Sequence, residues 1–365
     1  MANEGARPLN QQGRIIARMK IWLPYVEAGS GVDVFTRNLA RSLRQLGHEA
    51  VVTRFPHRWQ YFPWRLRLAP RLAGAQLILA NTWNGFCFKH PGVPLVAVEH
   101  LFVLDPALPP YKSLAQGAFH HTLVRYYERR SVALADQLVA VSRATAQALA
   151  HHFGRPAPPI IPNGIDVDFF CPPARREPLS DRPLRLLFVG NMSRRKGSDL
   201  LIPIIERLGP GFELNYTSGL RVDEPFGAIP GMQPLGRLDQ EQVRDAYQRA
   251  DILLFPTRLE GLPLVAMEAM ACGTPVLAHR TSSLPEVVTD GIDGVLCPVN
   301  DVDAFVDAIR GLKADPDRLA AMGSAARATA EDRFCLSRMA REYKALFESL
   351  IGEGSSAPGT FQGSA

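Results

Sequence analysis

The sequence lacks several features that would assign it to a protein class at once. Its five cysteines are odd in number and widely spaced, and no pair has zinc or redox spacing, so we expect reduced thiols. No apolar run approaches the roughly 20 residues that a membrane-spanning helix needs. The opening MANEGARPLNQQGR has no apolar stretch and predicts a flexible lead-in, not a signal peptide. Together these absences predict a cytoplasmic chain.

The sequence also lacks a large net charge, because its basic and acidic residues nearly balance. The formal net charge is only +5 over 365 residues, and no known nucleic-acid-reading motif gathers the basic residues on one element. Nucleic acid is therefore excluded as a partner. A slightly basic, solvated surface accounts for this charge, and an anionic lipid surface or an acidic acceptor is the alternative.

Short apolar runs alternate with amphipathic stretches along most of the chain, which is the pattern of strand–helix units around a parallel sheet. A helix is expected over residues 32–46 and ends at Gly47. Its apolar face consists of Phe35, Leu39, Leu43 and Leu46. In this half we expect strands near the start of 14–22 and over 49–53, 76–80, 94–98 and 137–141.

The segment CPPARREPLSDRP, residues 171–183, has prolines and charges without periodicity, and it predicts a linker. After it the alternation restarts with the strand LRLLFV and a helix that ends at Leu208. Asp239 and Gln242 form a capping-box pair that opens another helix, and ILLFP is the next strand.

We therefore predict an α/β fold of two Rossmann-like domains, residues 14–175 and 183–334, that face a central cleft. Ligands bind such folds at the carboxyl ends of the strands. The apolar face of residues 335–351 predicts a helix that packs back on the N-terminal domain. The tail, residues 352–365, has too little apolar content to fold and is expected to be disordered.

The most informative segment is LEGLPLVAMEAMACGTPVLAH, residues 259–279, in which seven residues separate Glu260 from Glu268. Pro263 suits the first turn of a helix that stops at Gly273, so Glu260 lies just before the helix and Glu268 within it. Side chains lean toward a helix N-terminus, so Glu268 should point back toward the cleft. Two such glutamates, taken alone, more often stabilise a helix or lie on its solvated face than bind a ligand. The apolar helix around this pair, with Gly261 and Pro263 in its loop, favours a ligand-binding site instead.

Backbone amides at the start of this helix suit a diphosphate, because they point outward and the helix dipole is positive there. The amides belong to Gly261, Leu262 and Leu264. A carboxylate such as that of Glu268 can accept two hydrogen bonds from a ribose diol.

Together with four further motifs, this segment resembles the signature of the large retaining glycosyltransferase family of GT-B fold, numbered four. The other motifs are VGNMSRRKG (189–197), IPNGIDVDFF (161–170), SSLPEVVTDGIDGVLCP (282–298) and LARSLRQLGHEA (39–50). The resemblance extends from about residue 15 to residue 351. It implies transfer of a sugar, with retention at the anomeric carbon, from a nucleotide-diphosphate donor of UDP or GDP type, and no essential divalent metal.

The resemblance also implies roles for individual residues. Glu260 would orient and stabilise the sugar, and Glu268 would bind the ribose. Arg195 and Lys196 would neutralise the diphosphate, whose charge grows as the glycosidic bond breaks, with Arg194 a weaker candidate.

Glycines and strand ends complete the predicted site. Gly190 forms the phosphate-loop turn, and Asn191 follows it where many relatives carry arginine. The loop of Gly29, Ser30 and Gly31 resembles the one that approaches the phosphates from the other domain, and His100 resembles a strand-end histidine near the transferred sugar.

Glu286 also matches a recurrent family position, but Ser283 and Glu286 have the spacing of a capping box, which we prefer as the explanation.

The acceptor is expected to be a saccharide or a lipid-linked molecule of cell-envelope polysaccharide or lipopolysaccharide synthesis. Residues 57–72 and 111–130 interleave aromatic and basic side chains, which suits contact with an anionic membrane at its inner face; ordinary loop packing is the alternative. A GT-B sugar-nucleotide epimerase and a non-catalytic nucleotide-sugar-binding protein are the rival functions.

Overall fold

The N-terminal half of the computed structural model is built on a parallel sheet. The structure describes residues 18–29, 31–180, 182–217 and 229–354. The five strands lie in the order β2 (Glu49–Phe55), β1 (Lys20–Val26), β3 (Leu77–Asn81), β4 (Leu95–Glu99) and β5 (Gln137–Ala140). The predicted strands are all present within a few residues, although residues 14–17 lie outside the described part.

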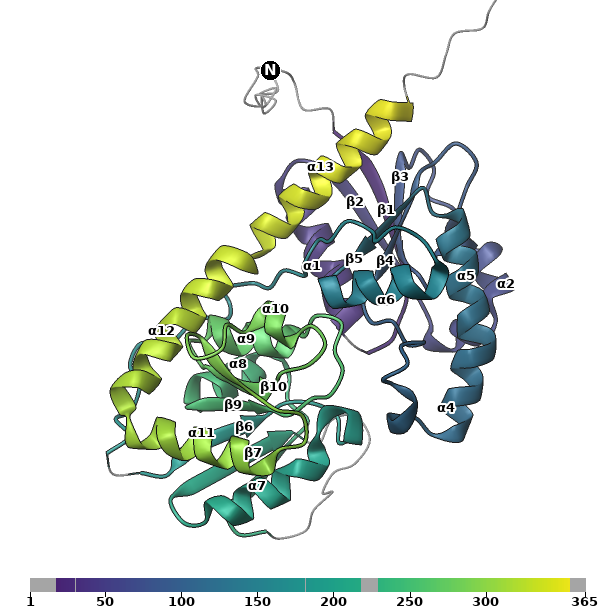
Figure 1. The fold of residues 1–365 in the computed structure, drawn as a ribbon. Coiled ribbons are helices and arrows are strands. Elements are labelled where there is room, and N and C mark those ends of the chain that lie inside the picture. Colours follow the sequence, from purple (N-terminus) through teal and green to yellow (C-terminus); the bar gives the residue numbers. More distant parts are fainter. Residues whose placement is uncertain (1–17, 30, 181, 218–228, 355–365) are drawn as a thin grey trace, which may run out of the picture.

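Helices and turns surround this sheet (Figure 1). They are α1 (Gly31–Gln45), η1 (His57–Tyr61), α2 (Pro63–Arg67), α3 (Gly85–Phe88), η2 (Pro109–Tyr111), α4 (Leu114–Phe119), the π-helical η3 (His120–Val124), α5 (Arg125–Leu134) and α6 (Arg143–Phe153). Phe35, Leu39 and Leu43 of α1 are buried, as predicted. Leu46, the fourth residue of the predicted face, lies just beyond the end of the helix and is only half-buried.

The C-terminal half contains a six-stranded parallel sheet. Its order is β11 (Gly294–Cys297), β10 (Val276–His279), β9 (Ile252–Phe255), β6 (Leu184–Phe188), β7 (Phe212–Thr217) and β8 (Met232–Gly236). Its helices and turns are η4 (Arg194–Lys196), η5 (Ser198–Leu200), α7 (Leu201–Leu208), α8 (Gln240–Arg249), α9 (Leu264–Ala271), α10 (Leu284–Val287), α11 (Val302–Ala314) and α12 (Pro316–Arg333). Two Rossmann-like domains are thus present, as predicted.

Arginines attach the segment between the domains to the C-terminal domain. Arg176 donates to the carbonyls of Ala250 (2.9 Å) and Cys272 (2.8 Å). Arg327 of α12 donates to the carbonyls of Val167 and Phe170, each at 2.8 Å. The predicted domain limits near this segment stay predictions.

The last helix, α13 (Leu336–Gly354), leaves the C-terminal domain and runs along the N-terminal one (Figure 1). Tyr343 and Phe347 are fully buried, and the Tyr343 ring meets the Phe35 ring of α1 at 5.9 Å between centroids. The C-terminal helix therefore packs back on the N-terminal domain, as predicted. The helix continues to Gly354, and the predicted limit at residue 351 stays a prediction. Residues 355–365 of the predicted tail lie outside the described part.

Candidate active site

A cleft of about 550 Å³ lies between the two domains. It lies at the carboxyl ends of β1, β4, β6, β7 and β8, because the carboxyl ends of parallel strands meet at one edge of a sheet. Its lining includes Gly29, Gly31, His100, Gly190, Asn191, Arg195, Lys196, Glu260, Gly261, Leu262 and Leu264. These are all the predicted site residues except Glu268 and the supporting Ser30 and Arg194; Ser30 lies outside the described residues.

The centre of the cleft is an ion-pair network on Glu260. Its Oε1 accepts hydrogen bonds from Lys196 Nζ at 2.6 Å and Thr257 Oγ1 at 2.7 Å, and Arg195 lies at 3.3 Å. All three bonds fall on the same oxygen, and within the described part of the chain Oε2 has no hydrogen-bond partner. The side chain of Glu260 is 9% exposed.

Two cations and one carboxylate leave this network with a single excess positive charge. Burial alone would raise the pKa of Glu260, but the adjacent Lys196 and Arg195 hold that pKa below its usual value. Burial lowers the pKa of Lys196, and Glu260 opposes this effect. We take both groups as ionised at neutral pH, so the floor of the cleft is suited to an anion.

Glycine is required in the loop that carries the two cations. Gly197 has φ of +76°, and a Cβ there would lie 2.0 Å from the carbonyl oxygen of Pro256. The turn Arg194–Lys196 is capped by Ser193, whose side chain accepts from the Lys196 amide. The motif after β6 therefore folds tightly against β9 and directs Arg195 and Lys196 into the cleft.

Glu268 lies one helical turn beyond Leu264 and is not among the lining residues. Tyr247 of α8 donates a hydrogen bond of 3.2 Å to its Oε2. Burial raises the pKa of Glu268 to about 7. Glu268 is thus held outside the lining of the cleft, and its proposed contact with a ribose remains a prediction.

The N-terminal domain contributes a loop and a histidine. Asp33 closes the loop by accepting hydrogen bonds from the amides of Ala28 (3.1 Å) and Gly29 (2.9 Å), and Gly29 has φ of +62°. The His100 ring packs edge-on against Phe35 with centroids 4.5 Å apart. Burial lowers the pKa of His100 to about 4, so its imidazole is neutral at physiological pH.

The domains touch across the cleft at a glycine. A Cβ on Gly261 would lie 1.5 Å from the carbonyl oxygen of His100, so only glycine permits this approach. Beside it, Asn163 Nδ2 donates to the carbonyl of Leu262 at 3.3 Å. The site is therefore assembled from both halves of the chain.

The predicted capping box of Ser283 and Glu286 was wrong. Ser283 makes no side-chain cap; its Oγ donates to the carbonyl of Glu260 at 3.1 Å. The Glu286 carboxylate instead accepts hydrogen bonds from the amides of Arg143 (2.7 Å) and Ala144 (2.9 Å) in the other domain. A local spacing rule cannot see an acceptor brought in from a distant segment.

Several lining residues were missed by the sequence analysis. Asn163, Thr217, Gly236, Arg237, Leu238 and Val243 also line the cleft. Thr217 ends β7 and donates to, and accepts from, the backbone of Gly190. Asn163 lies within the quoted motif IPNGIDVDFF, which was the available signal. Thr217 and Gly236 end the strands β7 and β8, which were not predicted, and Arg237 and Leu238 follow β8. Val243 lies on α8, whose start was predicted.

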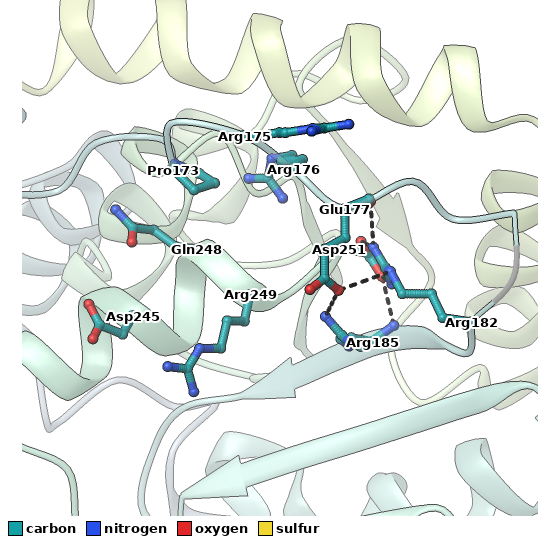
Figure 2. Close-up of a pocket in the computed structure, with 10 residues that line it drawn as sticks. All are labelled: Pro173, Arg175, Arg176, Glu177, Arg182, Arg185, Asp245, Gln248, Arg249 and Asp251. Carbon is teal, nitrogen blue, oxygen red and sulfur yellow. Dashed lines mark hydrogen bonds and ion pairs between the residues drawn. The ribbon is translucent and has the colours of Figure 1, made fainter.

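A second hollow, of about 300 Å³, lies beside the linker (Figure 2). It is rich in arginine, but Arg182 pairs with Asp251 at 2.6 and 2.8 Å and Arg185 pairs with Glu177 at 2.7 Å. Figure 2 shows that Arg249 points away from these pairs. Among the described residues that line the hollow, the Arg182 and Arg185 side chains are therefore already paired with carboxylates.

Two family models match the chain. "Glycosyl transferases group 1" matches residues 227–329, and "Glycosyltransferase Family 4" matches residues 51–169. The first contains both predicted glutamates, and the second contains His100.

Curated relatives carry similar names. A D-inositol 3-phosphate glycosyltransferase of Xylanimonas cellulosilytica is 33% identical over 228 residues, which cover 55% of this chain and 54% of the relative. A GDP-mannose-dependent alpha-(1-6)-phosphatidylinositol monomannoside mannosyltransferase of Mycolicibacterium smegmatis is 34% identical over 225 residues. These residues cover 55% of this chain and 59% of the relative. The match thus spans little more than half the length of these relatives.

Solved structures share the fold. Sucrose-phosphate synthase from Thermosynechococcus elongatus superposes with a TM-score of 0.76 at 20% identity, over 92% of this chain and 100% of that one. The Anabaena protein HepE, in complex with UDP and glucose, superposes with a TM-score of 0.70 at 18% identity. The superposition covers 91% of this chain and 100% of HepE. At such identities the likeness establishes the two-domain fold alone.

Proposed function

The chain belongs to the GT-B glycosyltransferases of group 1 and family 4, and from that premise we propose that it transfers a sugar, with retention, from a nucleotide-diphosphate donor. The observation that carries the proposal is the partly buried network of Lys196, Arg195 and Glu260 in the interdomain cleft. The proposed donor is of UDP or GDP type. One relative is named as GDP-mannose-dependent, and HepE was crystallised with UDP-glucose.

In this proposal the diphosphate binds between Lys196, Arg195 and the first amides of α9. The excess positive charge attracts the donor, and it becomes more favourable as negative charge develops on the leaving diphosphate. Gly261 lines this part of the cleft, and the N-terminus of α9 adds its dipole.

Glu260 is proposed to orient the transferred sugar. Its Oε1 is occupied by Lys196, Thr257 and Arg195, and its Oε2 would accept a sugar hydroxyl. His100, neutral because it is buried, would hydrogen-bond the same sugar from the other domain. That no divalent metal is essential is part of the proposal, and activity should then survive a chelator.

A screen of UDP-glucose, GDP-mannose and ADP-glucose for thermal stabilisation tests the proposal. The true donor should raise the melting temperature by roughly 5 °C at about a hundredfold excess over its Kd, because it binds only the folded chain. No shift with any sugar nucleotide would contradict the donor site.

Product analysis separates the rival functions. A glycosyltransferase releases nucleoside diphosphate in an acceptor-dependent manner. A GT-B epimerase would change the sugar without an acceptor, and a binding protein would be stabilised without any release.

The proposed acceptor is a saccharide or lipid-linked molecule of the cell envelope. The names of the curated relatives, an inositol phosphate and a phosphatidylinositol mannoside enzyme, support a polar acceptor that is in one case lipid-linked.

We further propose that the N-terminal domain contacts an anionic membrane at its inner face. Among the described residues no helix has the length and apolarity to cross a bilayer. The helices α2, α4 and α5 lie along one edge in Figure 1. Exposed apolar side chains occur on these helices, on η1 and η3, and at the two residues that flank α2: Tyr61, Phe62, Trp64, Leu68, Leu114, Leu123 and Tyr126. Tyr61 and Phe119 touch at 5.3 Å between centroids, which joins the two aromatic–basic stretches.

Two members of the predicted stretches do not belong to this surface. The Trp59 ring stacks on Phe55, and Arg71 lies over Trp22 and donates to the carbonyl of Cys87.

Co-sedimentation of the protein with lipid vesicles tests the membrane contact. We expect the protein to sediment with anionic vesicles but not with neutral ones, and equal recovery with both would contradict the membrane contact.

A further inference from the structure

Glu286 caps a helix of the other domain. It lies on α10 of the C-terminal domain, and its carboxylate accepts from the amides of Arg143 and Ala144, the first two residues of α6. The third amide, of Thr145, donates to Ser142 Oγ at 3.1 Å. Two of the three leading amides of α6 are therefore bonded to protein only while the domains touch. The side chain of Glu286 is 18% exposed, and its contact with α6 lies at the edge of the interface, where the Arg143 side chain is 73% exposed.

The residues just before Glu286 hold the backbone of Glu260. Ser282 Oγ accepts from the Glu260 amide at 2.9 Å and donates to the Glu260 carbonyl at 3.0 Å. Ser283 Oγ donates to the same carbonyl at 3.1 Å. Ser282 has φ of +48°, a left-handed conformation that is unfavourable for serine. Such strain persists where the surroundings impose it, and here the two bonds to Glu260 do so.

We propose that Glu286 is a positioning residue, which couples closure of the two domains to the placement of Glu260 in the cleft. Residues 282–286 form one short arm, with Glu260 fixed at one end and α6 of the other domain at the other. When the domains close, Glu286 gains two charge-assisted bonds at a helix N-terminus, and the arm is held in place. When they open, water replaces these bonds and the arm is released.

The arm is anchored on the side of its own domain. Arg333 of α12 donates to the main-chain carbonyl of Glu286. The close approach of Gly261 to the His100 carbonyl belongs to the same closed arrangement. The role for Glu260 rests on the proposed function, whereas the contact of Glu286 with α6 does not.

Hydrogen exchange of the ligand-free protein tests the contact itself. In Glu286→Ala, the amides of Arg143 and Ala144 should exchange about tenfold faster, while those of the central strands β4 and β9 are unchanged. Glu286→Gln, which keeps the shape but loses the charge, should fall between wild type and Glu286→Ala, and it serves if the alanine variant folds poorly. Glu348→Ala, which removes a 2.7 Å ion pair with Lys344 within α13, is the matched control. Unchanged exchange at the start of α6 in both Glu286 variants would overturn the proposal.

Kinetics test the coupling. With the sugar nucleotide that stabilises the wild type, the Glu286 variants should lose about tenfold in kcat, yet bind the free nucleoside diphosphate within about twofold of wild type. An equal loss of nucleotide affinity and kcat, or wild-type kcat, would overturn the coupling. If no sugar nucleotide stabilises or reacts with the wild type, the proposed function fails, and the exchange result still decides whether Glu286 holds the domains together.

Discussion

Glu268 and Glu260 are close in sequence but lie in opposite electrostatic environments. Glu260 is surrounded by cations that lower its pKa against the effect of burial. Among the described residues, Glu268 has only the Tyr247 hydroxyl as a hydrogen-bond partner, and burial raises its pKa to about 7. One carboxylate is therefore charged throughout the physiological range, and the other is near its midpoint there.

This difference predicts a pH-dependent donor affinity. A ribose diol donates to the ionised carboxylate, so binding favours the deprotonated form of Glu268. The affinity for a sugar nucleotide should therefore rise about tenfold from pH 6 to pH 8, the range in which a group of pKa about 7 loses its proton. Calorimetric titration at both pH values measures it, and Glu268→Gln should remove the dependence. A wild-type affinity that does not change with pH would contradict contact between Glu268 and the donor.

At the scale of elements, patterns within one segment predicted the structure well. The capping box of Asp239 and Gln242 opens α8 with both bonds at 2.9 Å. The spacing of Phe35, Leu39 and Leu43 predicted the buried face of α1, because a helix must bury its apolar stripe. Each of these features is decided by residues within a few turns of one another.

Contacts made by an element outside its own segment were not predictable in this way. Ser283 and Glu286 have capping-box spacing, yet their partners are the Glu260 carbonyl and the start of α6. Trp59 has the composition of an interfacial residue, but it stacks on Phe55. Residue type and spacing state what a side chain can bind, and only the tertiary arrangement decides which partner reaches it.

The loop before α9 gives a prediction about one glycine. Gly261→Ala should force the His100 carbonyl away, since a Cβ would lie 1.5 Å from its oxygen. We expect a loss of about tenfold or more in turnover and a larger radius of gyration by X-ray scattering, with each domain still folded. Gly311→Ala, on α11 with nothing within 4 Å of the added atom, is the control. Wild-type turnover and dimensions in Gly261→Ala would show that the close approach is dispensable.

At the scale of the whole molecule, the fold and the composition of the cleft could be predicted because motifs lie at strand ends in both halves. The sequence resemblance anticipated two facing domains and most of the lining residues. It did not anticipate how the halves meet: the contacts of Gly261 with His100, of Asn163 with Leu262, and of Glu286 with α6 depend on the relative placement of the domains. No periodicity within either half encodes that placement.

The cations beside Glu260 are proposed to bind the diphosphate of a sugar nucleotide. Calorimetric titration of the stabilising sugar nucleotide into wild type, Lys196→Ala and the control Lys344→Ala tests this claim most directly. Lys344 pairs with Glu348 on α13, away from the cleft. We predict that Lys196→Ala weakens binding by about 2 kcal/mol, roughly thirtyfold, because a largely buried charge-assisted contact is lost, and that Lys344→Ala binds as wild type does. Equal affinity for wild type and Lys196→Ala would contradict the account.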